Sequence, residues 1–152
     1  MIRKLEVADS QMVRTTMQTM AATMYPELIP DIEKVHWLIR DATSSDKHYA
    51  RVVGPVGEPK AVLVARVQQN MWAAKKSATV LLWYSEQPGA GAALMRDFVK
   101  WVVKDPQIVM AGLTIDWCGA DWRVVRMLEH IGFVDRGGSL VYFPRGRKDG
   151  LV

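Results

Sequence analysis

Residues 81–102 combine an apolar strand-like segment, a short loop with two glycines and a helix-like segment. They read LLWYSEQPGAGAALMRDFVKWV, and after the loop the apolar residues recur at helical spacing. A glycine-rich loop between a strand and a helix is typical of phosphate binding, because free backbone N–H groups and the positive end of the helix dipole converge there. The segment therefore predicts an α/β fold with an anion site where this helix begins.

Two common phosphate loops do not fit this segment. A P-loop requires Lys followed by Ser or Thr after its last glycine, whereas Gly91 is followed by Ala92 and Ala93. A dinucleotide fingerprint requires a third small residue where Leu94 stands. The loop therefore has to belong to another class of anion site.

Length and composition indicate one ordinary domain. The chain has 152 residues, 49% of them hydrophobic, which is enough for a sizeable core. We expect a single domain over residues 1–145 and a short basic tail over 146–152. Cys118 is the one cysteine, so no internal disulfide forms, and no Cys/His cluster has metal-ligand spacing. The apolar runs are too short for a membrane span and the first residues carry no signal region, so we expect a cytoplasmic protein without metal.

Hydrophobic periodicity and turn residues predict alternating elements without an internal repeat. We expect helices over 9–24, 31–42, the segment from the glycine loop to Lys104, and 120–131. Asp9 or Ser10 could cap the first helix. We expect strands over 2–7, 48–54, 60–69, 77–84 and 108–118, and a closing hairpin over 133–143 that turns at Gly137 and Gly138. The order is β-α-α-β-β-β-α-β-α-β-β.

This order and its motifs resemble the GNAT superfamily of acyl-CoA-dependent N-acyltransferases over nearly the whole chain. The likeness lies in the opening IRKLEVAD, the helical pair after it, the EQPGAG loop and the segment RMLEHIGFVDRG. It implies a mixed α/β sheet, mostly antiparallel, splayed between the fourth and fifth strands and flanked by about four helices. The whole also looks similar to compact GNAT-like proteins encoded by tailed phages.

The resemblance implies a site for acetyl-CoA or coenzyme A. The family loop has the pattern Gln/Arg-x-x-Gly-x-Gly/Ala, which residues 86–91 match at both glycines. The pyrophosphate would then lie against the helix start, and the pantetheine arm would bind along the fourth strand, where a backbone N–H near Leu82 or Trp83 would stabilise the oxyanion. The implied cofactor-binding residues are Leu82, Trp83, Tyr84, Gln87, Gly89, Ala90, Gly91 and Ala92.

The sequence departs from the family pattern at groups that carry charge or a proton. Leu128 stands where family members commonly have a general-acid tyrosine, and Asp121 replaces the usual Asn at the start of the fourth helix. In the loop, Glu86 replaces Gln or Arg and adds negative charge near a pyrophosphate, while Pro88 removes one N–H donor. We therefore expect a weakened coenzyme A site and an acid–base apparatus unlike the usual one.

Two residues are candidates for proton transfer. Asp116 could act as general base, directly or through water, or could instead cap the following helix. Tyr84 could protonate the leaving thiolate, or could only pack against a neighbouring side chain. Cys118 is better explained as a small buried side chain. Glu27 could meet a cationic acceptor, or could be a solvated loop carboxylate.

Three functions remain open from the sequence. The first is an N-acyltransferase that moves an acetyl or other acyl group from acyl-CoA to an amine of a small molecule or protein. The second is a catalytically inactive GNAT-fold module for binding or assembly, like the phage-encoded proteins that the chain resembles, with a protein partner or a homodimer. The third, nucleic-acid binding, has little support, because the compact basic cluster of Arg145, Arg147 and Lys148 is best explained as a solvated tail.

Overall fold

The computed structural model describes residues 1–29, 31–114 and 122–145. Its helices are α1 (Ser10–Met24), α2 (Ile32–Ser44), α3 (Ala90–Lys104) and α4 (Trp122–Ile131), with a 3₁₀ turn at Val7–Asp9. Its strands are β1 (Ile2–Lys4), β2 (His48–Val53), β3 (Ala61–Gln69), β4 (Lys76–Ser85), β5 (Ile108–Thr114), β6 (Val134–Asp135) and β7 (Ser139–Tyr142). The order predicted from the sequence is confirmed.

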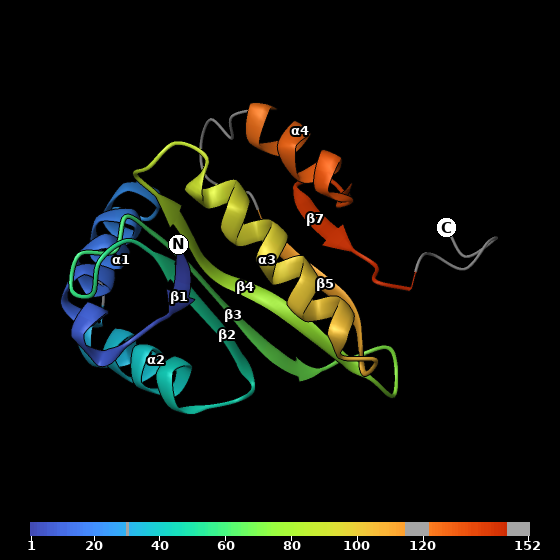
Figure 1. The fold of residues 1–152 in the computed structure, drawn as a ribbon, viewed down its shortest axis with the longest axis horizontal. Helices are drawn as coiled ribbons and strands as arrows, with labels where there is room; N and C mark the ends of the chain where they lie inside the picture. The colour runs from blue at the N-terminus through green and yellow to red at the C-terminus, as the bar shows by residue number, and fades with distance from the viewer. Residues whose placement is uncertain (30, 115–121, 146–152) are drawn as a thin grey trace.

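All seven strands form one sheet in the order β1-β2-β3-β4-β5-β7-β6 (Figure 1). Every neighbouring pair is antiparallel except β4 and β5, which run parallel because α3 carries the chain back between them. The predicted fold class, a mostly antiparallel mixed sheet with four helices, is therefore confirmed.

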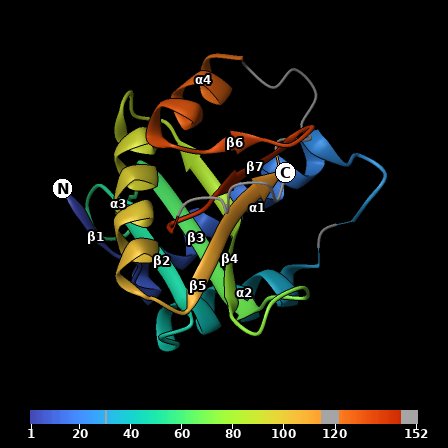
Figure 2. The same cartoon turned by 90° about the vertical axis from the view of Figure 1, so that its right-hand side faces the viewer.

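The helices cover both faces of the sheet. Figure 2 shows α3 on one side of the strands and α1 and α2 on the other. The α3 side holds the larger core, built around Phe98, Leu94 and Tyr49, and α4 packs on it through Leu128. The smaller core joins α1 and α2 to the strands through Val13, Ile39 and Val52 and their neighbours. Because α3 covers part of one face of β2 and β3 while α1 and α2 cover the other, both strands hold buried apolar residues on both faces.

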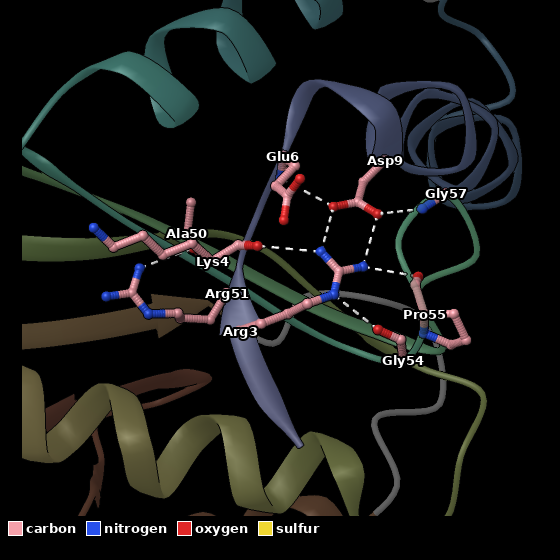
Figure 3. A network of polar contacts seen from close by, with 9 residues as sticks. All are labelled: Arg3, Lys4, Glu6, Asp9, Ala50, Arg51, Gly54, Pro55 and Gly57. Carbon is pink, nitrogen blue, oxygen red and sulfur yellow. Dashed lines mark hydrogen bonds and ion pairs between the residues drawn. The ribbon is translucent and has the colours of Figure 1, made fainter.

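A buried ion pair fixes the start of the chain to the turn between β2 and β3 (Figure 3). The Asp9 carboxylate is fully buried and accepts hydrogen bonds from both terminal nitrogens of Arg3, each at 2.8 Å. It also accepts from the backbone N–H groups of Glu6 and Gly57. Arg3 in turn donates to the carbonyl oxygens of Gly54 and Pro55. Both charged groups of the pair therefore have several hydrogen-bond partners, which offsets the cost of burying them.

The predicted position of the α1 cap is confirmed, but the side-chain hydrogen bond expected of a cap does not form. We expected Asp9 or Ser10 to cap α1, and Asp9 does occupy the N-cap position. Its side chain makes no cap hydrogen bond to the helix, however, because Arg3 and the backbone N–H groups of Glu6 and Gly57 use its oxygens. Pairing with Arg3, six residues earlier, and with the distant N–H of Gly57 prevailed over the capping preference.

We predict that Asp9→Asn lowers the free energy of unfolding by about 3 kcal/mol, at the lower end of the range for breaking a buried pair. The lower end applies because the Arg3 side chain is 20% exposed and water can partly solvate it. Urea unfolding of the purified variant measures the change. Asp46→Asn, at an exposed position, is the matched control and should change stability little. An equal change in both variants would contradict the importance of the pair.

The same pair should make stability depend on pH. Burial acts to raise the pKa of Asp9, but the Arg3 side chain and the N–H groups of Glu6 and Gly57 outweigh it and lower that pKa. A carboxyl whose pKa is lower in the folded state contributes stability above its unfolded pKa and loses it as the pH falls through the folded value. We therefore expect the wild type to lose stability below about pH 4, and Asp9→Asn to lose less over the same range. Parallel urea curves from pH 7 to pH 3 test this.

Candidate functional site

The parallel strands β4 and β5 separate part of the way along their length. Their pairing runs from Lys76 with Ile108 to Thr79 with Gly112. Beyond it β4 continues to Ser85 beside β3, while β5 continues to Thr114 beside β7. Within the described residues, no strand pairs with the outer edge of β4 after Thr79. An unpaired strand edge offers backbone donors and acceptors to an extended ligand.

One extra residue in β4 accompanies this separation. Val64 of β3 pairs with Leu82, but the next residue, Ala65, pairs with Val80, so Leu81 has no partner and forms a bulge. The bulge reverses the side-chain alternation of β4. Before it, Ala78 and Val80 contact the core on the α3 side, and after it Leu82 and Tyr84 contact the core on the α1 side.

The opening between β4 and β5 contains a small apolar cavity of about 90 Å³. Its walls come from the bulged part of β4, the end of β5 and the last turns of α1. They comprise Val80, Leu81, Leu82, Trp83, Leu113, Thr114, Met20 and Met24. Met20 also packs on the smaller core, so this side chain belongs to both the core and the cavity wall.

The glycine loop lies between the unpaired end of β4 and α3, where two side chains of β4 hold it. The Ser85 hydroxyl donates to the carbonyl oxygen of Gln87 at 2.7 Å, and the Trp83 indole N–H donates to that of Gly91 at 3.1 Å. The N–H of Ala90 bonds back to Gln87. These bonds fix the start of α3 relative to the strand edge and the cavity beside it.

The two glycines serve different structural needs. Gly89 has φ +78°, a left-handed conformation that favours glycine, and a Cβ there would meet nothing within 4 Å. Gly91 is buried, and a Cβ there would lie 3.1 Å from the Ser85 Cβ and 3.3 Å from the Trp83 Nε1. Gly91 therefore allows α3 to pack closely on β4, whereas Gly89 allows the turn into the helix.

The start of α3 can accept an anion, although two neighbours oppose it. Helix geometry leaves the N–H groups of Gly91 and Ala92 without an intrahelical acceptor, at the positive end of the helix dipole. Pro88 has no N–H, and the exposed Glu86 carboxylate adds a negative charge beside the loop. The site therefore has the features of an anion site of reduced strength.

Tyr84 forms a hydrogen bond with this carboxylate. Its hydroxyl donates to Glu86 Oε1 at 3.0 Å, and that hydrogen bond is the main cause of the raised pKa of Tyr84, with a smaller effect of burial. Tyr84 therefore holds its proton more tightly than an ordinary tyrosine. Sequence reasoning singled out both residues but did not predict that they pair.

The structure places the remaining candidates as follows. Leu128 is fully buried in the larger core. Glu27 lies exposed in the turn after α1, and nothing in the described part of the chain brings it to the cavity. Asp116, Cys118 and Asp121 lie outside the described residues, as do Arg147 and Lys148. Arg145 is exposed and donates to the carbonyl oxygen of Val103.

The fold is that of the GNAT N-acetyltransferases. Its defining features are the sheet order, the separating parallel pair, the bulged fourth strand and the glycine turn into α3. Solved structures agree over almost the full length of the chain. A ribosomal-protein-alanine N-acetyltransferase from Brucella melitensis is 11% identical with a TM-score of 0.72, over 94% of this chain and 99% of that chain. Spermidine N-acetyltransferase from Vibrio cholerae, in complex with CoA and spermine, is 11% identical with a TM-score of 0.69, over 95% of each chain.

NAA60 of Arabidopsis thaliana, in complex with acetyl-CoA, is 12% identical with a TM-score of 0.67, over 96% of this chain and 99% of that chain. No protein-family model matches the sequence, and no curated protein matches it either. At these identities the likeness establishes the fold.

No described helix has both the length and the apolar character needed to cross a membrane. In the same part of the chain, no three His, Cys, Asp or Glu side chains come together as a metal site.

We predict that Gly91→Val destabilises the protein by about 1–3 kcal/mol, because its methyl groups would enter the packed contact between α3 and β4. Gly89→Ala should cost about 1 kcal/mol through backbone strain alone. Thermal and urea unfolding of both variants measure the costs. If Gly91→Val were as stable as the wild type, the close packing of α3 on β4 would be refuted.

Proposed function

We propose that this protein is an N-acyltransferase that transfers an acetyl or related acyl group from acyl-CoA to an amine. The observation that carries the proposal is the opening between β4 and β5, with its free strand edge, apolar cavity and adjoining helix start. These three features can bind an extended polar arm, enclose a thioester and hold a pyrophosphate.

Each part of the opening has a role in this proposal. The N–H groups of Gly91 and Ala92 would hold the pyrophosphate, with Gln87, Gly89 and Ala90 shaping the loop around it. The free edge of β4 at Leu82, Trp83 and Tyr84 would bind the pantetheine arm, and a backbone N–H there would stabilise the oxyanion. The cavity walls would exclude water from the thioester.

In the reaction, the amine nitrogen forms a bond to the thioester carbonyl carbon, the C–S bond breaks and the thiolate leaves. Positioning of the two reactants would supply most of the rate, because few proton-transfer groups line the described cavity. The amine also has to lose a proton and the thiolate has to gain one.

The structural neighbours support this assignment. Those described above carry names of N-acetyltransferases, and their structures include complexes with acetyl-CoA and with CoA plus spermine. By analogy we propose acetyl-CoA as the acyl donor, and either a small amine or the amino group of a protein as the acceptor.

Proton transfer is the least conventional part of the proposal. The Leu128 side chain has no titratable proton, so another residue has to act as the acid. We propose Tyr84 as the acid for the thiolate and Asp116 as the base for the amine. Tyr84 would have to turn its hydroxyl away from Glu86 to act.

A second candidate function is a coenzyme A-binding module that no longer catalyses transfer and instead binds or assembles with another protein. The observation that favours it is the fully buried Leu128 at the position of the family acid. Binding without turnover would support this alternative. Both candidate functions require a ligand at the start of α3.

Calorimetric titration with acetyl-CoA and with coenzyme A, at low and at physiological salt, is the first test. Micromolar binding that persists at physiological salt supports a coenzyme A site, and absence of binding at millimolar ligand contradicts both candidate functions. A thiol-release assay with spermine and with peptides bearing a free amino terminus then separates an active enzyme from an inactive module.

Charge at the loop should tune this affinity. We predict that Glu86→Gln strengthens coenzyme A binding about fivefold at low salt, since two unit charges at 4 Å in water interact by ~1 kcal/mol. Ala92→Asp should weaken binding by at least as much while leaving α3 intact, because an acidic residue in the first helical turn favours the helix. Calorimetry gives the affinities and thermal unfolding verifies the fold. Unchanged affinity in both folded variants would contradict the loop as the phosphate site.

The proposed proton-transfer residues have a separate test. Tyr84→Phe should reduce turnover with little change in coenzyme A affinity, and Asp116→Asn should reduce turnover at neutral pH and change its pH profile. Steady-state rates between pH 6 and pH 9 measure both effects. Equal rates across this range would exclude the substituted residue from the mechanism.

A further inference from the structure

A second concave site lies on the α3 side of the sheet, away from the β4–β5 opening. β1 and β2 extend beyond the edge of α3 there, and no other described helix covers them (Figure 1). The resulting pocket has a volume of about 530 Å³, within the range of small-molecule sites. Its lining includes Tyr49 and Arg51 from β2, and Asp97, Lys100, Trp101 and Lys104 from α3.

The charges around this pocket are predominantly positive. Arg51, Lys100 and Lys104 line it, and Lys4 stands directly opposite Arg51 on the neighbouring strand. Figure 3 shows the Lys4 and Arg51 side chains extending in the same direction from their strands. No acidic residue that the structure describes forms an ion pair within 4.0 Å of any of these four cations.

This arrangement costs the isolated chain some stability. Like charges directly opposite on antiparallel strands repel, as Lys4 and Arg51 do, and like charges four residues apart on a helix repel, as Lys100 and Lys104 do. The helix dipole explains Lys104, which lies in the last turn of α3, and the Asp97 carboxylate, three residues before Lys100, offsets part of that charge, but neither explains the convergence of Arg51 with both lysines. An anion that binds between these two pairs would reduce the repulsion within each of them.

The floor of the pocket is rigid. The Tyr49 hydroxyl donates to Asp97 Oδ2 at 2.7 Å, which joins β2 to α3. The Arg51 guanidinium lies over the Tyr49 ring, 5.3 Å from its centroid, and Trp101 meets that ring edge to face. Arg51 is therefore held over the pocket by a buried aromatic cluster instead of moving freely in solvent.

We propose that this pocket binds a small molecule bearing phosphate groups. Arg51 supplies a planar donor suited to phosphate oxygens, Lys100 and Lys104 supply charge, and the half-buried Trp101 supplies an apolar wall for the rest of the ligand. The site shares no lining residue with the β4–β5 cavity, so the two sites can be occupied and tested independently.

The test uses inorganic pyrophosphate as the probe, titrated at physiological salt and followed by ¹H–¹⁵N NMR. We expect saturable shifts at the amides of Arg51, Lys100 and Trp101, separate from any shifts at residues 89–92. The double variant Arg51→Gln/Lys100→Gln should weaken the first set at least tenfold and leave the second set unchanged. Its thermal stability without ligand should stay close to that of the wild type, because the reduced charge repulsion offsets the lost contact between Arg51 and the Tyr49 ring.

A control variant with the same loss of charge is Lys34→Gln/Lys75→Gln, at two exposed lysines that do not line the pocket. It should bind pyrophosphate like the wild type. Equal weakening in both double variants would show that the overall positive charge of the protein attracts pyrophosphate, and this would overturn the proposal. So would the absence of saturable shifts up to 10 mM pyrophosphate, or binding of an RNA oligonucleotide without binding of pyrophosphate.

Discussion

One unpaired residue, Leu81, determines how the two halves of this fold are joined. β3 is regular, so the extra residue in β4 has to be absorbed on one side, and the strand changes the face to which its side chains point. Bulges strengthen the local twist. The twist turns the end of β4 away from β5, and the free strand edge, the apolar cavity and the approach to the glycine loop all lie along that turned end.

Much of the fold could be predicted from the sequence, because each element carries a strong local signal. The apolar run of β3, the helical spacing in α3 and the glycine turn before it predicted the element order, and the resemblance to the GNAT superfamily implied the splayed, mostly antiparallel sheet. The bulge could not be predicted, since VLLWY is an unbroken apolar stretch in which no residue marks the extra position. The role of Asp9 was missed for another reason: Arg3 belongs to a different element, β1, and Gly57 lies far along the chain, so no helix-capping pattern connects them to Asp9.

The candidate site was predictable only in part. The loop residues were identified from their spacing, but spacing could not show that Gly91 faces β4 whereas Gly89 faces open space. Met20 and Met24 illustrate a similar ambiguity, because helical spacing assigns them to an inward face without showing that the face ends at a cavity. The pairing of Tyr84 with Glu86 joins two residues on the same strand end, which a motif comparison treats separately. These features depend on three-dimensional juxtaposition, which residue order does not specify.

The Arg3–Asp9 network helps to hold one of the two walls of the opening between β4 and β5. It anchors the start of α1, and α1 carries Met20 and Met24 to the cavity between β4 and β5, whereas α3 is anchored by its own aromatic core and by Trp83 and Ser85. The α1 wall therefore depends on an ion pair as well as on apolar packing, whereas the α3 wall depends on apolar packing and hydrogen bonds. Acid would weaken the anchoring of α1 before that of α3, so the wall that carries Met20 and Met24 is the more adjustable one.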